Sequence, residues 1–86
     1  DMQSFHREVI GTIRLYDNQH NTNLLETLEC YFANDGNLKN TAAALHLHKN
    51  SVIYRLKKIE EITGFDLRNP NDRFNLELGI KLDRIV

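Results

Sequence analysis

The chain has only one cysteine and no long apolar run, and each shortage excludes a class of protein. A single cysteine, Cys30, cannot form an internal disulfide, which fits a reducing compartment and predicts a cytoplasmic location. No apolar run is long enough to cross a membrane, so we expect no membrane partner. The balanced charge and the spread of apolar residues over 86 residues favour one small folded domain, residues 1–86.

Acidic residues are also absent from the whole stretch between Asp35 and Glu60, which we call the acid-free window. The window holds five lysines and arginines, and removing them from the chain's 11 leaves six basic against 12 acidic residues. A chain with a formal net charge of −1 therefore carries a short positive region on an acidic body. Such a basic patch is the electrostatic signature expected of a nucleic-acid-binding surface.

The apolar spacing and the composition predict an all-α fold with about five helices. We expect the helices at about Ser4–Leu15, Asn23–Asn34, Leu38–Leu45, Lys49–Ile62 and from Pro70 to the C-terminus. The sequence from Asp17 to Thr22 is typical of a polar connector between the first two helices.

Local signals predict where these helices begin and end. Asn23 and Glu26, three residues apart, resemble a capping box at the start of the second helix. Asn37 is expected to cap the third helix, and Asn69, which Pro70 follows, to cap the last. Left-handed glycines are expected directly after the second and fourth helices, at Gly36 and Gly64.

Helical periodicity predicts which sides of the first and last helices face the core. In the first helix the predicted core stripe is Phe5, Val9, Ile13 and Tyr16. In the last helix the predicted stripe is Phe74, Leu78, Leu82 and Ile85, broadened by Leu76 and Ile80.

The acid-free window satisfies the requirements of a helix–turn–helix, in which two short helices meet at a tight turn. Ala42 is small enough to let the second helix cross the first, and Leu47 can fill the angle after the turn. Val52 and Leu56 supply the inner face of the second helix. His46 occupies a turn position at which φ is often positive, a conformation that histidine tolerates better than most residues.

In this register the second helix of the motif carries side chains that suit the reading of DNA bases. Lys49 can donate to guanine, Asn50 can pair with adenine, Ile53 can touch a thymine methyl, and Tyr54 can stack on sugar and donate to phosphate. The predicted base-contacting residues are His48, Lys49, Asn50, Ile53 and Tyr54.

Other polar residues of the window are predicted to hold the phosphate backbone and to fix the register of the protein on the duplex. The predicted backbone-contacting residues are Asn40, Thr41, Ser51, Arg55, Lys57 and Lys58. The predicted partner is therefore double-stranded DNA.

The sequence HKNSVIYRLKKI, from His48 to Ile59, resembles the signature of the PucR/CdaR-type helix–turn–helix. This family comprises the C-terminal DNA-binding domains of bacterial purine-catabolism and sugar-diacid regulators. Weaker matching segments occur in order on both sides, at 16–17, 25–28, 31–32, 63–67 and 69–74. Gly79 stands where this resemblance leads us to expect alanine, and we expect it to loosen the last helix slightly.

The resemblance implies a bacterial transcriptional regulator whose sensory part lies N-terminal, so we expect this chain to be a C-terminal fragment. The motif is also similar to the Fis-type helix–turn–helix, which implies that the full-length protein binds a two-fold site as a homodimer.

Two other classes of function compete with DNA binding. In a helical self-association module, Ile53 and Tyr54 would contact another protein, and binding would lack the steep salt dependence of phosphate contacts. A metal site could be imagined from His46 and His48 with Cys30 or His20, but zinc sites usually need four well-spaced donors. No glycine-rich phosphate loop and no nucleophile–base–acid set is evident, so we expect no metal, no cofactor and no enzymatic activity.

Overall fold

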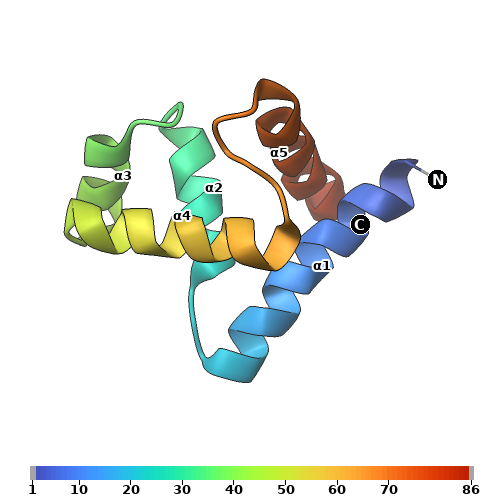
Figure 1. The fold of residues 1–86 in the computed structure, drawn as a ribbon, viewed down its shortest axis with the longest axis horizontal. Coiled ribbons are helices and arrows are strands. Elements are labelled where there is room, and N and C mark those ends of the chain that lie inside the picture. Colours follow the sequence, from blue (N-terminus) through green and yellow to red (C-terminus); the bar gives the residue numbers. More distant parts are fainter. Residues whose placement is uncertain (1, 86) are drawn as a thin grey trace.

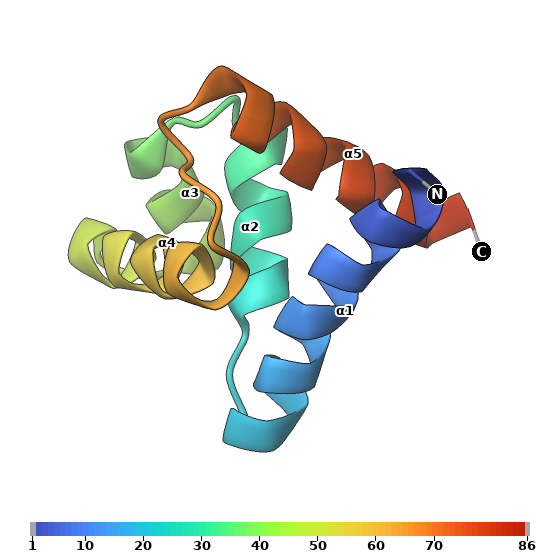
Figure 2. The ribbon, with the colours of Figure 1, turned by 45° about the vertical axis from the view of Figure 1, so that its right-hand side comes forward.

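The computed structural model describes residues 2–85, and within this range it contains five α-helices and no strand, which confirms the all-α prediction. In Figures 1 and 2, α1 and α5 lie side by side, and α2 stands between this pair and the pair formed by α3 and α4. No helix within the described range combines the length and apolarity needed to span a bilayer. The bounds are α1 (Met2–His20), α2 (Leu24–Ala33), α3 (Leu38–Leu45), α4 (Lys49–Thr63) and α5 (Pro70–Ile85).

The two helices of the predicted motif begin and end within one residue of the expected positions. Asn37 caps α3, because its side-chain oxygen accepts a hydrogen bond from the backbone N–H of Asn40 at 2.8 Å. His46 takes the left-handed conformation with φ of 57° and ends α3, and Gly64 does the same for α4 with φ of 78°. The local signals of the acid-free window therefore work as predicted.

The connector between α1 and α2 is shorter than predicted, because α1 continues through the first four residues of the Asp17–Thr22 segment to His20. The rings of Tyr16 and His20 stack with their centroids 4.0 Å apart, one turn apart on the helix. The connection that remains is residues 21–23, and its first residue, Asn21, has φ of 54°. Asparagine tolerates this left-handed conformation better than most residues.

The predicted capping box at Asn23 and Glu26 is wrong, since the Asn23 side chain makes no capping hydrogen bond. Asp17 takes this role from the preceding helix. Its two carboxylate oxygens accept hydrogen bonds from the backbone N–H groups of Leu24 at 2.8 Å and Leu25 at 3.0 Å. The N–H groups at the start of α2, which have no partner inside their own helix, are thus satisfied by an anion placed at the positive end of the helix dipole.

The core draws apolar side chains from all five helices and from the loop that joins α4 to α5. The predicted inner face of the motif is confirmed, because Ala42, Val52 and Leu56 are buried. The buried apolar residues are Ile10, Ile13, Leu24, Leu28, Ala42, Val52, Leu56, Ile59, Leu67, Leu76 and Ile80.

The predicted core stripes of α1 and α5 are partly wrong. In α1, Ile13 is buried as predicted, but Phe5 is exposed and Ile10 takes its place in the core. In α5 the predicted order is reversed. Leu76 and Ile80, expected only to broaden the stripe, are buried, while Phe74 and Ile85 are 63% and 77% exposed. The buried face of α5 is therefore rotated from the one that the periodicity favoured.

Gly79 explains this rotation, because it lies where α5 packs against α1. A Cβ atom at Gly79 would lie 3.0 Å from the carbonyl oxygen of His6 and 3.0 Å from Cγ1 of Ile10. Glycine thus lets the two helices approach closely, and the face of α5 that carries it turns inward. The expectation that Gly79 merely loosens the last helix misses this packing role.

Candidate nucleic-acid interface

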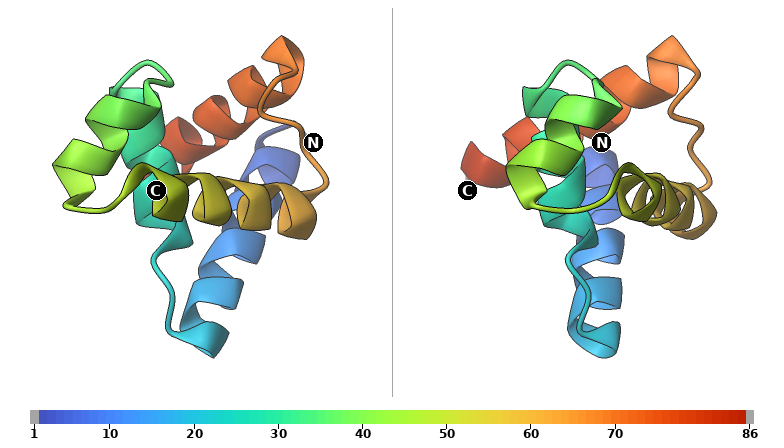
Figure 3. Two further views of the ribbon diagram at one scale, coloured as in Figure 1. Left: turned by 60° about the vertical axis from the view of Figure 1, so that its left-hand side comes forward. Right: turned by 90° about the vertical axis from the view of Figure 1, so that its left-hand side faces the viewer.

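The helix α4 lies on one face of the molecule and crosses in front of α2 in Figure 1. Its inner side is fixed by Val52, Leu56 and Ile59, which are all buried. In Figure 3 a tight turn joins α3 to the N-terminal end of α4. This inner stripe leaves the opposite side of α4 facing solvent.

The side chains predicted to contact bases lie along the outer side of the N-terminal half of α4. His48, Lys49 and Asn50 are exposed, Tyr54 is 66% exposed, and Ile53 is half-buried. Of these five residues, Ile53 is partly covered by the rest of the described chain. Their assignment to bases stays a prediction, but the burial pattern on which it depends is present.

His48 has a second role, because it caps the helix that it precedes. Its Nδ1 atom accepts a hydrogen bond from the backbone N–H of Asn50 at 3.0 Å. A neutral histidine that accepts at Nδ1 carries its proton at Nε2. The Nε2–H group is then left as a donor at the exposed start of α4.

The residues predicted to contact phosphates fall into two groups. Asn40, Ser51 and Lys57 are exposed. Arg55 and Lys58 are half-buried and already have partners in the chain. Arg55 donates through Nη1 to a buried threonine of α2 at 3.0 Å, and Lys58 pairs with a glutamate one turn further on, also at 3.0 Å. The hydrogen bond in this pair raises the pKa of Lys58, so the lysine stays charged.

Thr41 does not fit its predicted role. Its side chain is fully buried at 0% exposure, and its hydroxyl donates to the carbonyl oxygen of Asn37 at 2.7 Å. A hydroxyl held in this way inside the domain cannot reach a phosphate, so Thr41 is a packing residue of α3.

Sequence reasoning missed a groove between α4 and the connection 21–23. The groove has a volume of about 460 Å³, and α4 contributes Tyr54, Arg55 and Lys58 to its wall. The sequence gives only a weak signal for this groove, namely the two amides of Asn21 and Asn23 in a short connection. The neighbouring sequence does not indicate that this connection lies beside α4. The lining residues are Tyr16, Asn21, Thr22, Asn23, Leu24, Asn50, Ser51, Tyr54, Arg55 and Lys58.

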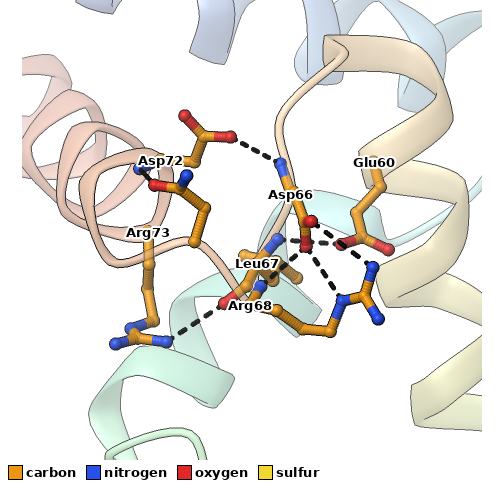
Figure 4. A network of polar contacts seen from close by, with 7 residues as sticks. Glu60, Asp66, Leu67, Arg68, Asp72 and Arg73 are labelled. Atoms are coloured by element: carbon orange, nitrogen blue, oxygen red, sulfur yellow. Dashed lines mark hydrogen bonds and ion pairs between the residues drawn. The ribbon is translucent and has the colours of Figure 1, made fainter.

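Glu60, Asp66 and Asp72, three of the acidic residues that follow the acid-free window, form hydrogen bonds in the α4–α5 loop (Figure 4). Glu60 accepts from the backbone N–H of Leu67 at 2.8 Å, and Asp72 accepts from that of Asp66 at 2.9 Å. The backbone N–H and the guanidinium of Arg68 lower the pKa of the Asp66 carboxyl. These three carboxylates therefore fix the α4–α5 loop, whereas Glu61 pairs with Lys58 on α4 itself.

Within the described residues, no three His, Cys, Asp or Glu side chains are grouped so as to hold a metal ion.

Two short helices meet here at a tight turn, and the second has an apolar inner side and an outer side of lysines, amides and a tyrosine. This arrangement defines the helix–turn–helix class. Residues 24–82 match the model of the PucR C-terminal helix-turn-helix domain, and the chain belongs to this family.

Curated relatives carry the same domain. The chain is 38% identical over 73 residues to the DNA-binding transcriptional activator AdeR of Bacillus subtilis (strain 168), a match that covers 85% of this chain and 17% of AdeR. It is 31% identical over 86 residues to the purine catabolism regulatory protein of the same organism, covering 100% of this chain and 16% of that protein. It is 39% identical over 70 residues to the carbohydrate diacid regulator of Escherichia coli (strain K12), covering 81% of this chain and 18% of the regulator. The chain thus spans less than a fifth of the length of these relatives.

A solved structure has the same fold. It is a regulator of polyketide synthase expression from Bifidobacterium adolescentis, with a TM-score of 0.68 and 34% sequence identity. The match covers 72% of this chain and 26% of that one.

Proposed function

We propose that this domain binds double-stranded DNA sequence-specifically on behalf of a bacterial transcriptional regulator, with α4 as the recognition helix in the major groove. The observation that carries the proposal is the exposed side of α4, where Lys49, Asn50 and Tyr54 lie inside a window free of acidic residues. The major groove is wide enough to admit an α-helix, and each base pair presents a distinct pattern of donors and acceptors there. Membership in the PucR C-terminal family supports the same function.

Each exposed residue of α4 has a role in this proposal. Lys49 donates to guanine O6 and N7, Asn50 pairs with adenine N6 and N7, and Ile53 contacts a thymine methyl. Tyr54 and the Nε2–H of His48 donate to acceptors at the edge of the groove. The phosphate contacts come from Asn40, Ser51, Arg55, Lys57 and Lys58.

We expect Lys49→Ala and Asn50→Ala each to weaken binding to the operator by about 1–3 kcal/mol and to relax base preference at one position. The physical reason is the loss of donors that match one base and mismatch the others. Fluorescence anisotropy on the promoter next to the protein's own gene, compared with single-base variants of that duplex, measures both effects.

Lys57→Ala serves as the matched control, because Lys57 lies on the same helix but is assigned to phosphate. It should weaken binding to all sequences alike and reduce the salt dependence of the affinity. If Lys49→Ala and Asn50→Ala left affinity and base preference unchanged, the assignment of Lys49 and Asn50 as base-contacting residues would be wrong.

At the level of the whole protein, we propose that this domain is the C-terminal DNA-binding part of a longer regulator that acts in the cytoplasm as a homodimer. Dimeric helix–turn–helix proteins bind two half-sites about 34–36 Å apart, one turn of DNA, so this proposal predicts an operator with two such half-sites. Sedimentation equilibrium of the full-length protein should give the mass of a dimer, and a monomer at all concentrations would rule this out.

A further inference from the structure

The groove beside α4 has the chemistry of a phosphate-binding surface. None of its lining residues is acidic, and they include two cations, Arg55 and Lys58. They also include side chains that donate without charge, namely the amides of Asn21, Asn23 and Asn50 and the hydroxyls of Ser51 and Tyr54. Arginine, lysine, serine, asparagine and tyrosine are the side chains that contact DNA phosphates most often.

Two carboxylates lie beside this groove, and both are already engaged: Glu61 pairs with Lys58 at 3.0 Å, and Asp17 accepts from the start of α2. Asp17 accepts three hydrogen bonds, from the hydroxyl of Thr22 at 2.6 Å and from the backbone N–H groups of Leu24 and Leu25. Its charge is thereby offset by the start of α2. The same bonds, together with one from the Thr22 N–H to the Asp17 carbonyl at 3.2 Å, hold the connection in place. Asn21 and Asn23 are thus presented on a fixed backbone, and both are exposed.

The geometry of an α-helix in the major groove of DNA indicates what would bind in this protein groove. The major groove is about 12 Å wide, and an α-helix with side chains is about 10–12 Å across. The sugar-phosphate strands must therefore pass along the flanks of the inserted helix. The groove with Asn21 and Asn23 lies along one flank of α4, as Figure 1 shows for the connection between α1 and α2.

The opposite flank of α4 has a different character. A second groove of about 500 Å³ there is lined by Ile53, Leu56 and other apolar side chains, together with two cations, Lys57 and Arg68, and the carboxylate of Glu60. Both grooves thus contain two cations, but only the first has no acidic lining residue and adds several amides to its cations. This difference argues for a phosphate strand on the first flank.

We propose that the connection between α1 and α2 binds one sugar-phosphate strand of the duplex through Asn21 and Asn23, opposite Arg55 and Lys58. The DNA-contacting surface then extends beyond the helix–turn–helix to residues before α2. This inference rests on the proposed function, because it takes α4 as the helix that enters the major groove. Phosphate contacts are independent of sequence, so the strand is held on any duplex.

Asn21→Asp and Asn23→Asp test the proposal, because they keep the shape of the side chain and replace a donor by a charged acceptor. Aspartate tolerates the left-handed conformation at position 21 and is a favourable residue before a helix at position 23, so both variants should fold. Each should lower the affinity for a random-sequence duplex of about 25 base pairs at least about tenfold at about 50 mM salt. Anisotropy titrations measure the affinity, and circular dichroism checks the fold.

Lys81→Gln is the matched control, since it changes the net charge by the same amount on α5, which Figure 2 shows on the other side of α2 from α4. Its affinity should stay within about twofold of the unchanged protein. If the two aspartate variants behave like Lys81→Gln while Lys57→Ala still weakens binding, the strand does not lie in this groove and the proposed function stands. If the unchanged protein binds no duplex at low salt, the proposed function and this inference fall together.

Discussion

Replacing Leu56 with alanine is expected to lower the free energy of unfolding by about 2–5 kcal/mol. Leu56 is buried beneath the exposed side of α4 and belongs to the core that joins α4 to α2 and α3. Truncation removes apolar surface from that core and leaves a cavity that helices of this length cannot fully close. Since small domains have only about 5–15 kcal/mol of stability in total, the variant should be close to unfolding.

Urea unfolding followed by circular dichroism measures this loss, and it suits a chain with no tryptophan. Lys57→Ala is the control, because the neighbouring side chain is exposed and its removal should change stability by no more than about 0.5 kcal/mol. A Leu56→Ala loss below about 1 kcal/mol would show that α4 is not anchored by this side chain. DNA affinity measured on the same two variants separates an effect on folding from an effect on the interface.

Replacing Gly79 with leucine is expected to lower the free energy of unfolding by about 1–3 kcal/mol or more, although leucine is the better helix former. A Cβ at this position already lies 3.0 Å from the backbone oxygen of His6, and a leucine adds three further carbons in the same direction. The helices α1 and α5 would have to move apart, which loosens the packing around Ile10.

Gly11→Ala is the matched control, because Gly11 is also inside a helix but its Cβ would meet nothing within 4 Å. It should raise stability by about 0.5–1 kcal/mol, as alanine loses less conformational freedom than glycine on folding. The two substitutions should therefore shift the urea midpoint in opposite directions. A stabilising Gly79→Leu variant would mean that the α1–α5 contact is not close at this point.

The parts of the fold that follow from local chemistry were predictable from the sequence. The bounds of α3 and α4 were predicted to within one residue. Asn37 caps α3 through a local hydrogen bond, and Gly64 ends α4 through its left-handed conformation, so neither signal depends on distant parts of the fold. The cap of α2 was not predictable in this way. Asn23 is a common capping residue, but Asp17 reaches the same N–H groups from a different helix.

The orientation of α5 could not be predicted for a related reason. Phe74 and Ile85 share one apolar stripe and Leu76 and Ile80 another, so periodicity alone gives no decision between the two. The decision comes from Gly79 and its contact with α1, which is remote in sequence.

In the candidate interface, too, the features set by local sequence were predictable and those set by contacts remote in sequence were not. The exposure of Lys49, Asn50 and Tyr54 was predictable, because it follows from the buried stripe of the helix that carries them. The burial of Thr41 was not, since its hydroxyl finds a carbonyl one turn back, and a polar residue satisfied in this way can sit inside a core. The groove at Asn21 and Asn23 depends on how two distant segments meet, so it needed coordinates.

The cap that Asp17 provides has a consequence for chimeras built from DNA-binding domains of this family. The family match covers residues 24–82, yet Asp17, Ile10 and Ile13 lie before it. A chimera joined at residue 24 would separate α2 from the carboxylate that completes its first turn and would uncover one side of the core. The segment that has to be transferred in a chimera is therefore longer than the segment that the family match covers, and the junction should be placed before α1.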